Sequence, residues 1–262
     1  MIEERSEEVE NIINKSESFL SFMTTNANKK KTKCDTVLAM QRSEIKYILT
    51  KEQLEYFKSA LVGHMEVDQY GKTSIESLYL DTPDYRLIRT SIEKPSYKEK
   101  IRIRSYGLAD KDTTVYLELK RKSCGLVYKR RIPLKEYQTD LIYQDHQIVE
   151  NSQIAKEINY FINFYGQLIP AFLIIYDRTA YFEPDTDLRL TIDENPRYRS
   201  DNLTLHTSLE GESLLEDGGA ILEIKVQEAM PLWLTEILSK GKIYKSSFSK
   251  VGTAYKKEMI KK

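Results

Sequence analysis

Three consecutive basic segments between residues 96 and 133 constrain the fold of this chain more than any other feature. In the first segment, Ile101 and Ile103 alternate with basic residues. Because residues two apart share one face of a β-strand, this alternation predicts a strand with one cationic face and one apolar face. The cations of this first face are Lys98, Lys100, Arg102 and Arg104.

The two segments that follow repeat the alternation. Glu118, Lys120 and Lys122 alternate with Leu117 and Leu119. In the third segment, the basic positions are Lys129 and Arg131, against Tyr128 and Ile132. Alternating charge usually marks a solvated sheet face. This face is almost entirely positive, however, and like charges on paired strands repel, so we favour a face that binds a polyanion.

The charge balance of the whole chain limits the kinds of partner that such a face can have. The 262 residues contain 40 Lys and Arg and 40 Asp and Glu, so the formal net charge is zero. A general nucleic-acid binder usually has a basic excess, and we therefore expect no nucleic-acid partner. The two cysteines form no disulfide or metal pattern, which favours a cytoplasmic protein. No apolar run approaches about 18 residues, so we expect no membrane segment.

The remaining periodicity predicts the domain organisation and an α+β fold. Residues 1–35 are expected to form an N-terminal tail, partly helical or disordered, and residues 36–262 to form one domain. Thr50 and Gln53 predict a capping box at the start of a helix. Seven or eight strands alternate charged and apolar faces, and helices are available to cover the apolar ones. A closed antiparallel barrel with helices packed on its outside would turn the charged faces toward one another.

Such a barrel would be lined by basic side chains from most of its strands. Confined cations repel one another unless anions neutralise them, and Arg guanidinium groups match phosphate oxygens in pairs. A triphosphate or polyphosphate fits this lining better than a nucleic acid, because no run of aromatic residues alternates with the cations to stack bases. The expected lining cations are Lys46, Lys98, Lys100, Arg102, Arg104, Lys120, Lys122, Lys129, Arg131, Arg178, Arg189, Lys225 and Lys250.

Three acidic residues, Glu44, Glu118 and Glu223, interrupt the basic rows. Each could form a salt bridge with a neighbouring cation, or could bind a divalent ion that also contacts phosphate. Phosphoryl transfer needs such an ion to neutralise charge. The sequence has no Gly-rich phosphate loop of the Walker type, so a nucleotide site would be of another kind.

Several short motifs, weak singly but specific in their order, resemble a known family. The chain resembles the vacuolar transporter chaperone (VTC) polyphosphate polymerase domain, within the CYTH-like triphosphate tunnel superfamily. The matching segments are RSEIKY at 42–47, SLYLDTPDY at 77–85, KIRIR at 100–104, YLELK at 116–120, YDR at 176–178, EIK at 223–225 and SFSK at 247–250.

This resemblance implies a closed, eight-stranded antiparallel tunnel barrel. It also implies that the protein elongates polyphosphate from ATP with Mn²⁺ or Mg²⁺, so that ATP and inorganic polyphosphate are the expected partners. The oligomeric state stays open.

The resemblance assigns roles residue by residue. The residues expected to act in catalysis are Lys46, Arg102, Arg104, Lys120, Arg178 and Arg189. Lys129 and Lys250 look like further phosphate ligands, and Tyr176 and Ser249 look like hydrogen-bond donors to phosphate. Lys100, Arg131 and Lys225 join the phosphate-binding set through their places in the basic rows. Glu223 looks like the metal ligand, with Glu44 and Glu118 as further candidates.

Two departures from the family pattern bear on the activity. Hydrolases and cyclases of the superfamily tend to carry Glu-x-Glu-x-Lys on the first strand, whereas this chain has Arg42 at the first Glu. A cation there weakens a second metal site and favours a phosphate acceptor over water. Ser247 replaces a family Lys. The alternatives to a polymerase are a metal-dependent inorganic triphosphatase and a polyphosphate-binding module without turnover.

Overall fold

The computed structural model describes residues 43–123, 126–144, 148, 151–216, 218–227 and 229–261. The predicted tail, residues 1–35, lies outside this range, as does Arg42. Within the described part of the chain, no helix combines the length and apolar character that crossing a membrane requires.

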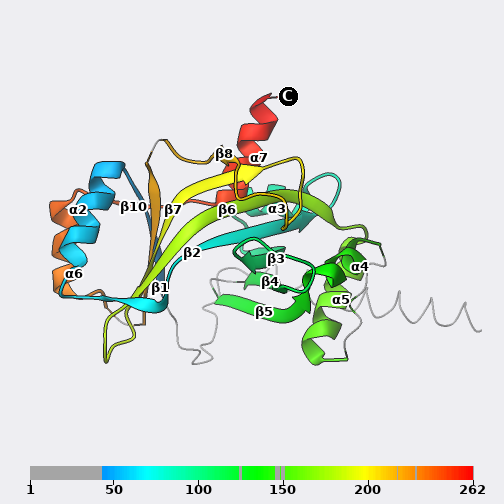
Figure 1. Cartoon of the computed structure of the whole chain (residues 1–262), viewed down its shortest axis with the longest axis horizontal. Coiled ribbons are helices and arrows are strands. Elements are labelled where there is room, and N and C mark those ends of the chain that lie inside the picture. The colour runs from blue at the N-terminus through cyan, green and yellow to red at the C-terminus, as the bar shows by residue number, and fades with distance from the viewer. Residues whose placement is uncertain are drawn as a thin grey trace, which may run out of the picture. The chain divides into compact units, whose positions relative to one another are not determined.

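A ten-stranded antiparallel sheet organises the fold (Figure 1). Its path runs β10-β1-β9-β7-β6-β2-β3-β4-β5, and β8 pairs with β7 off this path. The strands are β1 (Ser43–Leu49), β2 (Glu66–Asp81), β3 (Tyr97–Tyr106), β4 (Thr114–Ser123), β5 (Leu126–Lys135), β6 (Ile169–Phe182), β7 (Arg189–Arg199), β8 (Glu212–Ser213), β9 (Ala220–Val226) and β10 (Lys245–Ser246).

The α+β class is confirmed, but the predicted closed eight-stranded barrel is wrong. Closure would need β5 to pair with β1. In the described residues β5 pairs with β4, while β1 is flanked by β9 on one edge and β10 on the other. The Lys46–Ser246 and Tyr47–Lys245 pairings thus occupy the edge of β1 that closure would use. A barrel also needs matching tilt and stagger around the whole ring, which local alternation does not specify.

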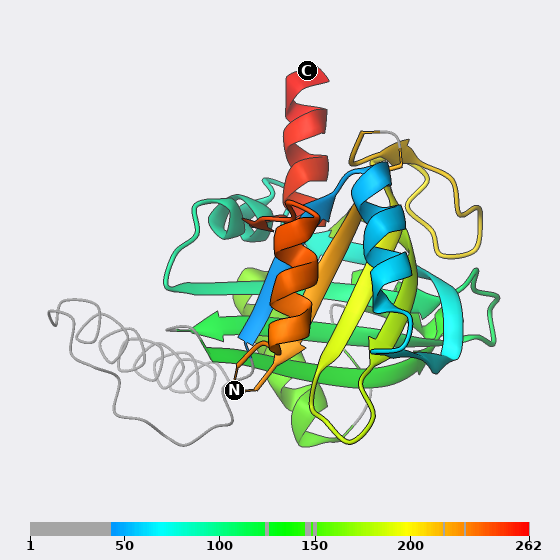
Figure 2. The ribbon, with the colours of Figure 1, turned by 90° about the vertical axis from the view of Figure 1, so that its left-hand side faces the viewer.

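The open sheet nevertheless curls until its distant strands approach one another. The Lys120 ammonium of β4 lies 3.9 Å from a carboxylate oxygen of Glu44 on β1. In Figure 2, β3, β4 and β5 pass behind β1, β9 and β7, with α2 and α6 in front. The charged side chains therefore converge on the inner face of the curl, as the alternation predicted.

Two groups of helices cover the apolar outer face. Helices α2 (Lys51–Leu61) and α6 (Leu232–Lys240) pack on β1, β7 and β9 around the fully buried Phe57. Thr50 caps α2, and the predicted capping box is confirmed. Helices α4 (Thr139–Gln144) and α5 (Gln153–Tyr165) pack on the strands around β3, with the short η1 (Glu136–Gln138) between β5 and α4. Each apolar strand face thus gains a helical partner.

Helices α3 (Arg86–Ile92) and α7 (Lys250–Lys261) lie on the inner face. Val251 and Ala254 of α7 pack against Phe172 and Tyr176 of β6. At the start of α3, the Asp81 carboxylate accepts hydrogen bonds from the backbone amides of Leu87 and Ile88, both at 2.8 Å. The inner face is therefore divided into an apolar part under these helices and a charged part beside them.

Candidate phosphate-binding site

The strand register brings the predicted basic residues into rows that cross the sheet. Lys100 of β3 pairs with Lys120 of β4, which pairs with Lys129 of β5. In the next row, Arg102 pairs with Glu118, which pairs with Arg131. We call this charged part of the inner face the cationic face; it consists of Lys46, Lys98, Lys100, Arg102, Arg104, Lys120, Lys122, Lys129, Arg131, Arg178, Lys225 and Lys250, with the carboxylates Glu44, Glu118, Asp193 and Glu223 among them.

Glu118 is buried at the centre of one cluster of cations. Arg102 donates from Nε and Nη2 to the same Glu118 oxygen, at 2.9 and 2.8 Å. Lys129 Nζ and Arg131 Nε lie 2.7 and 3.5 Å from the other oxygen, and Arg104 Nε lies 3.8 Å from the oxygen that Arg102 contacts. Burial alone would raise the pKa of Glu118, but these cations outweigh it and lower the pKa to about 2. The cations leave little room for a metal ion, so Glu118 is better suited to positioning arginines than to ligating metal.

A second cluster surrounds Asp193, which was not among the predicted site residues. Its buried carboxylate accepts from Arg178 Nη2 at 2.7 Å and also from the Lys250 ammonium. Burial would raise the pKa of Asp193, but the charges of Lys250 and Arg178 lower it below its ordinary value. Asp193 shares a strand face with Thr191 and Arg189, and this alternation was the one sequence signal that could have found it.

Glu223 and Glu44 share the ammonium group of Lys46, whose Nζ lies 2.6 and 3.4 Å from their carboxylate oxygens. Burial would raise the pKa of Glu223, but Lys250, Lys46 and Arg178 hold it well below its usual range. Within the described ranges, no three His, Cys, Asp or Glu side chains are grouped to hold a metal. Two carboxylates with phosphate oxygens are nevertheless a common Mg²⁺ environment, and Glu223 and Glu44 fit it.

Tyr79, which lies beside the cationic face, and Lys100 both have pKa values that are shifted strongly downward. Arg102 Nη1 donates to the Tyr79 hydroxyl at 2.9 Å. Burial would raise the pKa of Tyr79, but the charges of Arg102, Lys100 and Arg104 lower it to about 7. Burial lowers the pKa of Lys100 to about 8, although the neighbouring Tyr79 opposes this shift. The cationic face therefore has an excess of positive charge, and a bound anion would neutralise it.

The start of α7 contributes further groups to this face. The Ser249 hydroxyl accepts from the Gly252 amide at 3.2 Å, which is an N-cap contact, and accepts from Lys100 Nζ at 3.1 Å. Lys250 lies 4.4 Å from the ring centroid of Tyr176, whose hydroxyl accepts from Arg104 at 3.3 Å. The partial positive charge of a helix N-terminus adds to the attraction for anions.

Two of the predicted residues lie at the margin of this arrangement. Arg189 donates to the carbonyl oxygens of Thr186 and Leu188, at 2.9 and 2.8 Å, so it supports the turn before β7. Lys225 pairs with Glu44 on one side and with Arg189 on the other. The clusters around Glu118, Asp193 and Glu223 contain or adjoin the other predicted residues.

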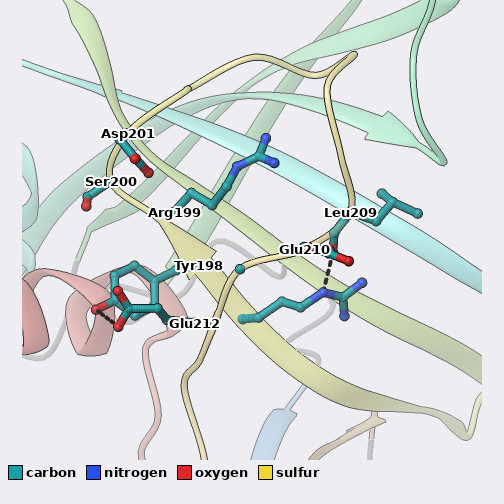
Figure 3. Close-up of a pocket in the computed structure, with 9 residues that line it drawn as sticks. Tyr198, Arg199, Ser200, Asp201, Leu209, Glu210 and Glu212 are labelled. Atoms are coloured by element: carbon teal, nitrogen blue, oxygen red, sulfur yellow. Dashed lines mark hydrogen bonds between the residues drawn. The ribbon is translucent and has the colours of Figure 1, made fainter.

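A separate pocket lies where β7 leads into residues 200–212 (Figure 3). Its two arginines are already engaged: Arg197 donates to the Leu209 carbonyl, and Arg199 donates to the carbonyls of Ser208 and Thr204 at 2.9 and 3.1 Å. Asp201, Glu210 and Glu212 complete much of the lining. The engaged arginines and the acidic rim make this pocket a poor site for phosphate.

Comparison with known proteins found a matching family model and solved structures of similar fold. A family model described as VTC domain matches residues 41–259. No curated protein matches the chain. Among solved structures, a presumed adenylate cyclase from Bacillus halodurans has a TM-score of 0.52 and 16% identity, covering 79% of this chain and 92% of that one.

A second solved structure is HpAC1 from Hippeastrum, a presumed adenylyl cyclase described as revealing a dominant triphosphatase activity. It has a TM-score of 0.53 and 18% identity, and the match covers 80% of this chain and 93% of that one. At these identities, the two likenesses concern the fold alone.

Proposed function

The chain belongs to the VTC domain family, and from this premise we propose that it is an ATP-dependent polyphosphate polymerase. It would transfer the γ-phosphate of ATP to the end of a polyphosphate chain bound on the cationic face. The observation that carries this proposal is the gathering of cations from β1, β3, β4, β5, β6 and α7 on one curled inner face. A cytoplasmic location is part of the same proposal.

The proposed reaction is an in-line phosphoryl transfer. A terminal phosphate oxygen of the chain attacks the γ-phosphorus of ATP, and the bond from this phosphorus to the β–γ bridging oxygen breaks. ADP leaves with that electron pair, and the chain is longer by one phosphate. The attacking oxygen is already anionic, so the protein needs to position two polyanions and neutralise their charge more than it needs to move a proton.

The protein groups that would do this are arranged around the buried carboxylates. Glu118 fixes the guanidinium of Arg102, and Asp193 fixes that of Arg178, so each presents its remaining N–H groups in a set direction. Such preorganised donors stabilise developing charge without rearranging during the reaction. Lys250, which also contacts Asp193, and the N-terminus of α7 supply further positive potential.

Glu223 and Glu44 are the residues that would hold Mn²⁺ or Mg²⁺ together with phosphate oxygens. When bound, the ion would neutralise charge on the transferred phosphoryl group. The Lys46 ammonium group lies between these carboxylates, and it would be available to phosphate if a metal ion took its place there.

The experiment that tests the proposal separates the products made from ATP. Purified protein is incubated with ATP and Mn²⁺, and long polyphosphate is resolved from free phosphate on a gel. Long chains with matching ADP support a polymerase. Free phosphate with ADP would instead identify a triphosphatase, and tight binding of polyphosphate without ADP would identify a binding module.

A further inference from the structure

The cationic face ends abruptly in aromatic residues. On β3, Tyr106 follows Arg104 on the same face, and on β4, Tyr116 precedes Glu118. The register places Arg104 opposite Tyr116, which in turn pairs with Pro133 of β5. Two residues further along each strand, about 7 Å beyond Arg104 and Glu118, this face carries the aromatic rings of Tyr106 and Tyr116.

These aromatic rings are held in place by Arg131. Its guanidinium carbon lies 3.5 Å from the ring centroid of Tyr116, and its Nη2 donates to the Tyr106 hydroxyl at 3.1 Å. The rings of Tyr106 and Tyr116 meet edge to face, with centroids 5.9 Å apart. Tyr106 is 46% exposed, Tyr116 is half-buried, and the Arg131 side chain is 35% exposed. Aromatic rings and guanidinium planes of this kind stack on nucleobases.

A nucleoside triphosphate is complementary to both the aromatic and the cationic part of this surface. Its base is flat and weakly polar, and its triphosphate is a dense anion. We propose that Tyr106, Tyr116 and Arg131 form the platform on which the base of the nucleoside triphosphate stacks, while the phosphates run toward Lys100 and Lys120. This inference rests on the proposed function and adds the place and the orientation of the nucleotide.

The orientation divides the cationic face into two ends. The base would lie beyond Arg104, and the polyphosphate would lie at the opposite end, where Lys98 pairs with Lys122. Stacking tolerates every base but favours those with larger rings. The platform therefore predicts that ATP binds more tightly than UTP, although the two carry the same charge.

Binding of ATP, UTP and tripolyphosphate is measured by calorimetry on the full chain in EDTA, where turnover is absent. Tyr106→Leu and Tyr116→Leu are each expected to weaken ATP binding by about 5- to 100-fold, the range that base stacking spans. Both should remove the preference for ATP over UTP and change tripolyphosphate affinity by less than about twofold, as expected for exposed or half-buried apolar replacements. Tyr106→Phe keeps the ring and should retain most of the ATP affinity.

Tyr128→Leu is the matched control, because Tyr128 is an exposed tyrosine of β5 that pairs with Arg121 on the outer face. It should leave both affinities unchanged. Equal losses of ATP and tripolyphosphate affinity in the Tyr106 and Tyr116 variants would overturn the platform, as would unchanged ATP affinity. If the Tyr106 and Tyr116 variants lose ATP affinity selectively but the protein makes no polyphosphate, the proposed polymerase is wrong and the stacking platform is supported. If the protein makes polyphosphate but the variants show no selective loss, the platform is wrong and the polymerase is supported.

Discussion

At the scale of single residues, buried carboxylates determine how the side chains of the cationic face are oriented. Glu118, Asp193 and Glu223 each contact more than one cation. An isolated charge would be costly to bury, but groups of opposite sign that hydrogen-bond to one another offset that cost. The three residues have the same charge but different surroundings, so substitutions that remove only the charge should separate their roles.

Glu118→Gln and Glu223→Gln are expected to differ in their effect on phosphate binding. Glu118→Gln leaves a group of buried cations without their partner, so it should lower the free energy of unfolding by about 3–5 kcal/mol. It should also weaken metal-free tripolyphosphate binding, because Arg102 loses its orientation. Glu223→Gln removes a repulsive charge, so metal-free binding should hold or tighten while ATP turnover with Mn²⁺ falls by orders of magnitude.

The measurements for these variants are urea unfolding, calorimetry in EDTA and ADP release with Mn²⁺. Glu236→Gln is the control and should change none of them, because Glu236 is exposed on α6 and its contact with Lys240 is a surface ion pair. Full turnover in Glu223→Gln would assign that residue to a structural ion pair, and Glu44 would become the first metal ligand to test.

The Tyr79–Lys100 pair predicts an unusual pH dependence. The folded pKa of Tyr79, about 7, lies below its ordinary value of 10, and that of Lys100, about 8, lies below 10.5. The folded protein therefore releases these protons before the unfolded chain does, and the free energy of unfolding should rise between about pH 7 and pH 10. A bound polyanion restores both protons, so tripolyphosphate affinity should fall over the same range.

Tyr79→Phe removes one of these protons and should flatten the dependence of tripolyphosphate affinity on pH. Calorimetry between about pH 7 and pH 9 measures both proteins, and the titration of the ligand itself is common to them. Identical slopes in the two proteins would show that Tyr79 keeps its proton throughout the range.

At the scale of elements, α7 both completes the inner core and brings two polar groups to the cationic face. Val251 and Ala254 anchor it under β6, while Ser249 and Lys250 begin it beside Asp193 and Lys100. The capping contact of Ser249 and its contact with Lys100 use the same hydroxyl, so two substitutions can distinguish the helix cap from the phosphate donor.

Ser249→Ala should remove the cap and cost about 1 kcal/mol. For a domain of this size, that corresponds to a fall in Tm of about 2–4 °C. Ser249→Asp restores a capping oxygen and should recover the Tm, but its negative charge should weaken tripolyphosphate binding further. Thermal unfolding and calorimetry on both variants give the test. Equal phosphate affinity in the Ala and Asp variants would mean that residue 249 lies away from the bound anion.

Local patterns in the sequence predicted the elements better than they predicted how those elements combine. The alternation from Lys98 to Arg131 specified which face is charged, because side-chain direction follows directly from strand geometry. The capping box at Thr50 was equally local. The placement of α7 on the inner face and the pairing of β10 with β1 depend on contacts between segments about 80 to 200 residues apart, which no short pattern records.

The same limit applies to the candidate site. Lys46, Arg102 and Arg178 could be named from the sequence. Strand alternation places Asp193 on the same face as Arg189, but it does not show that Asp193 is the counter-ion of Arg178 and Lys250. Tyr106 and Tyr116 were absent from the predicted site, although each continues the period-two row of its strand, because only charged residues were selected from these rows. They meet Arg131 only through the β3–β4–β5 register, which brings three strands side by side.

The whole molecule combines zero net charge with a strongly positive inner face, and this predicts selective stabilisation. Tripolyphosphate should raise the free energy of unfolding by about 2.7 kcal/mol at a concentration 100 times its Kd, because only the folded chain gathers the cations. Duplex DNA should produce a much smaller shift, because the net charge of the chain is zero and its cations are concentrated on the inner face. Thermal unfolding at equal ionic strength tests this, and equal shifts with both ligands would indicate a diffuse basic surface instead.

Among the described residues, the curled sheet is joined between β1 and β4 by the Lys120–Glu44 side chains rather than by a backbone ladder. An exposed ion pair of this kind contributes about 0–1 kcal/mol, so parting it is easy compared with breaking a row of strand hydrogen bonds. A polymer can then be laid in from the side instead of being threaded from one end. Polyphosphate with both ends blocked, and cyclic polyphosphate, should therefore bind to the open sheet, whereas a closed barrel would exclude both.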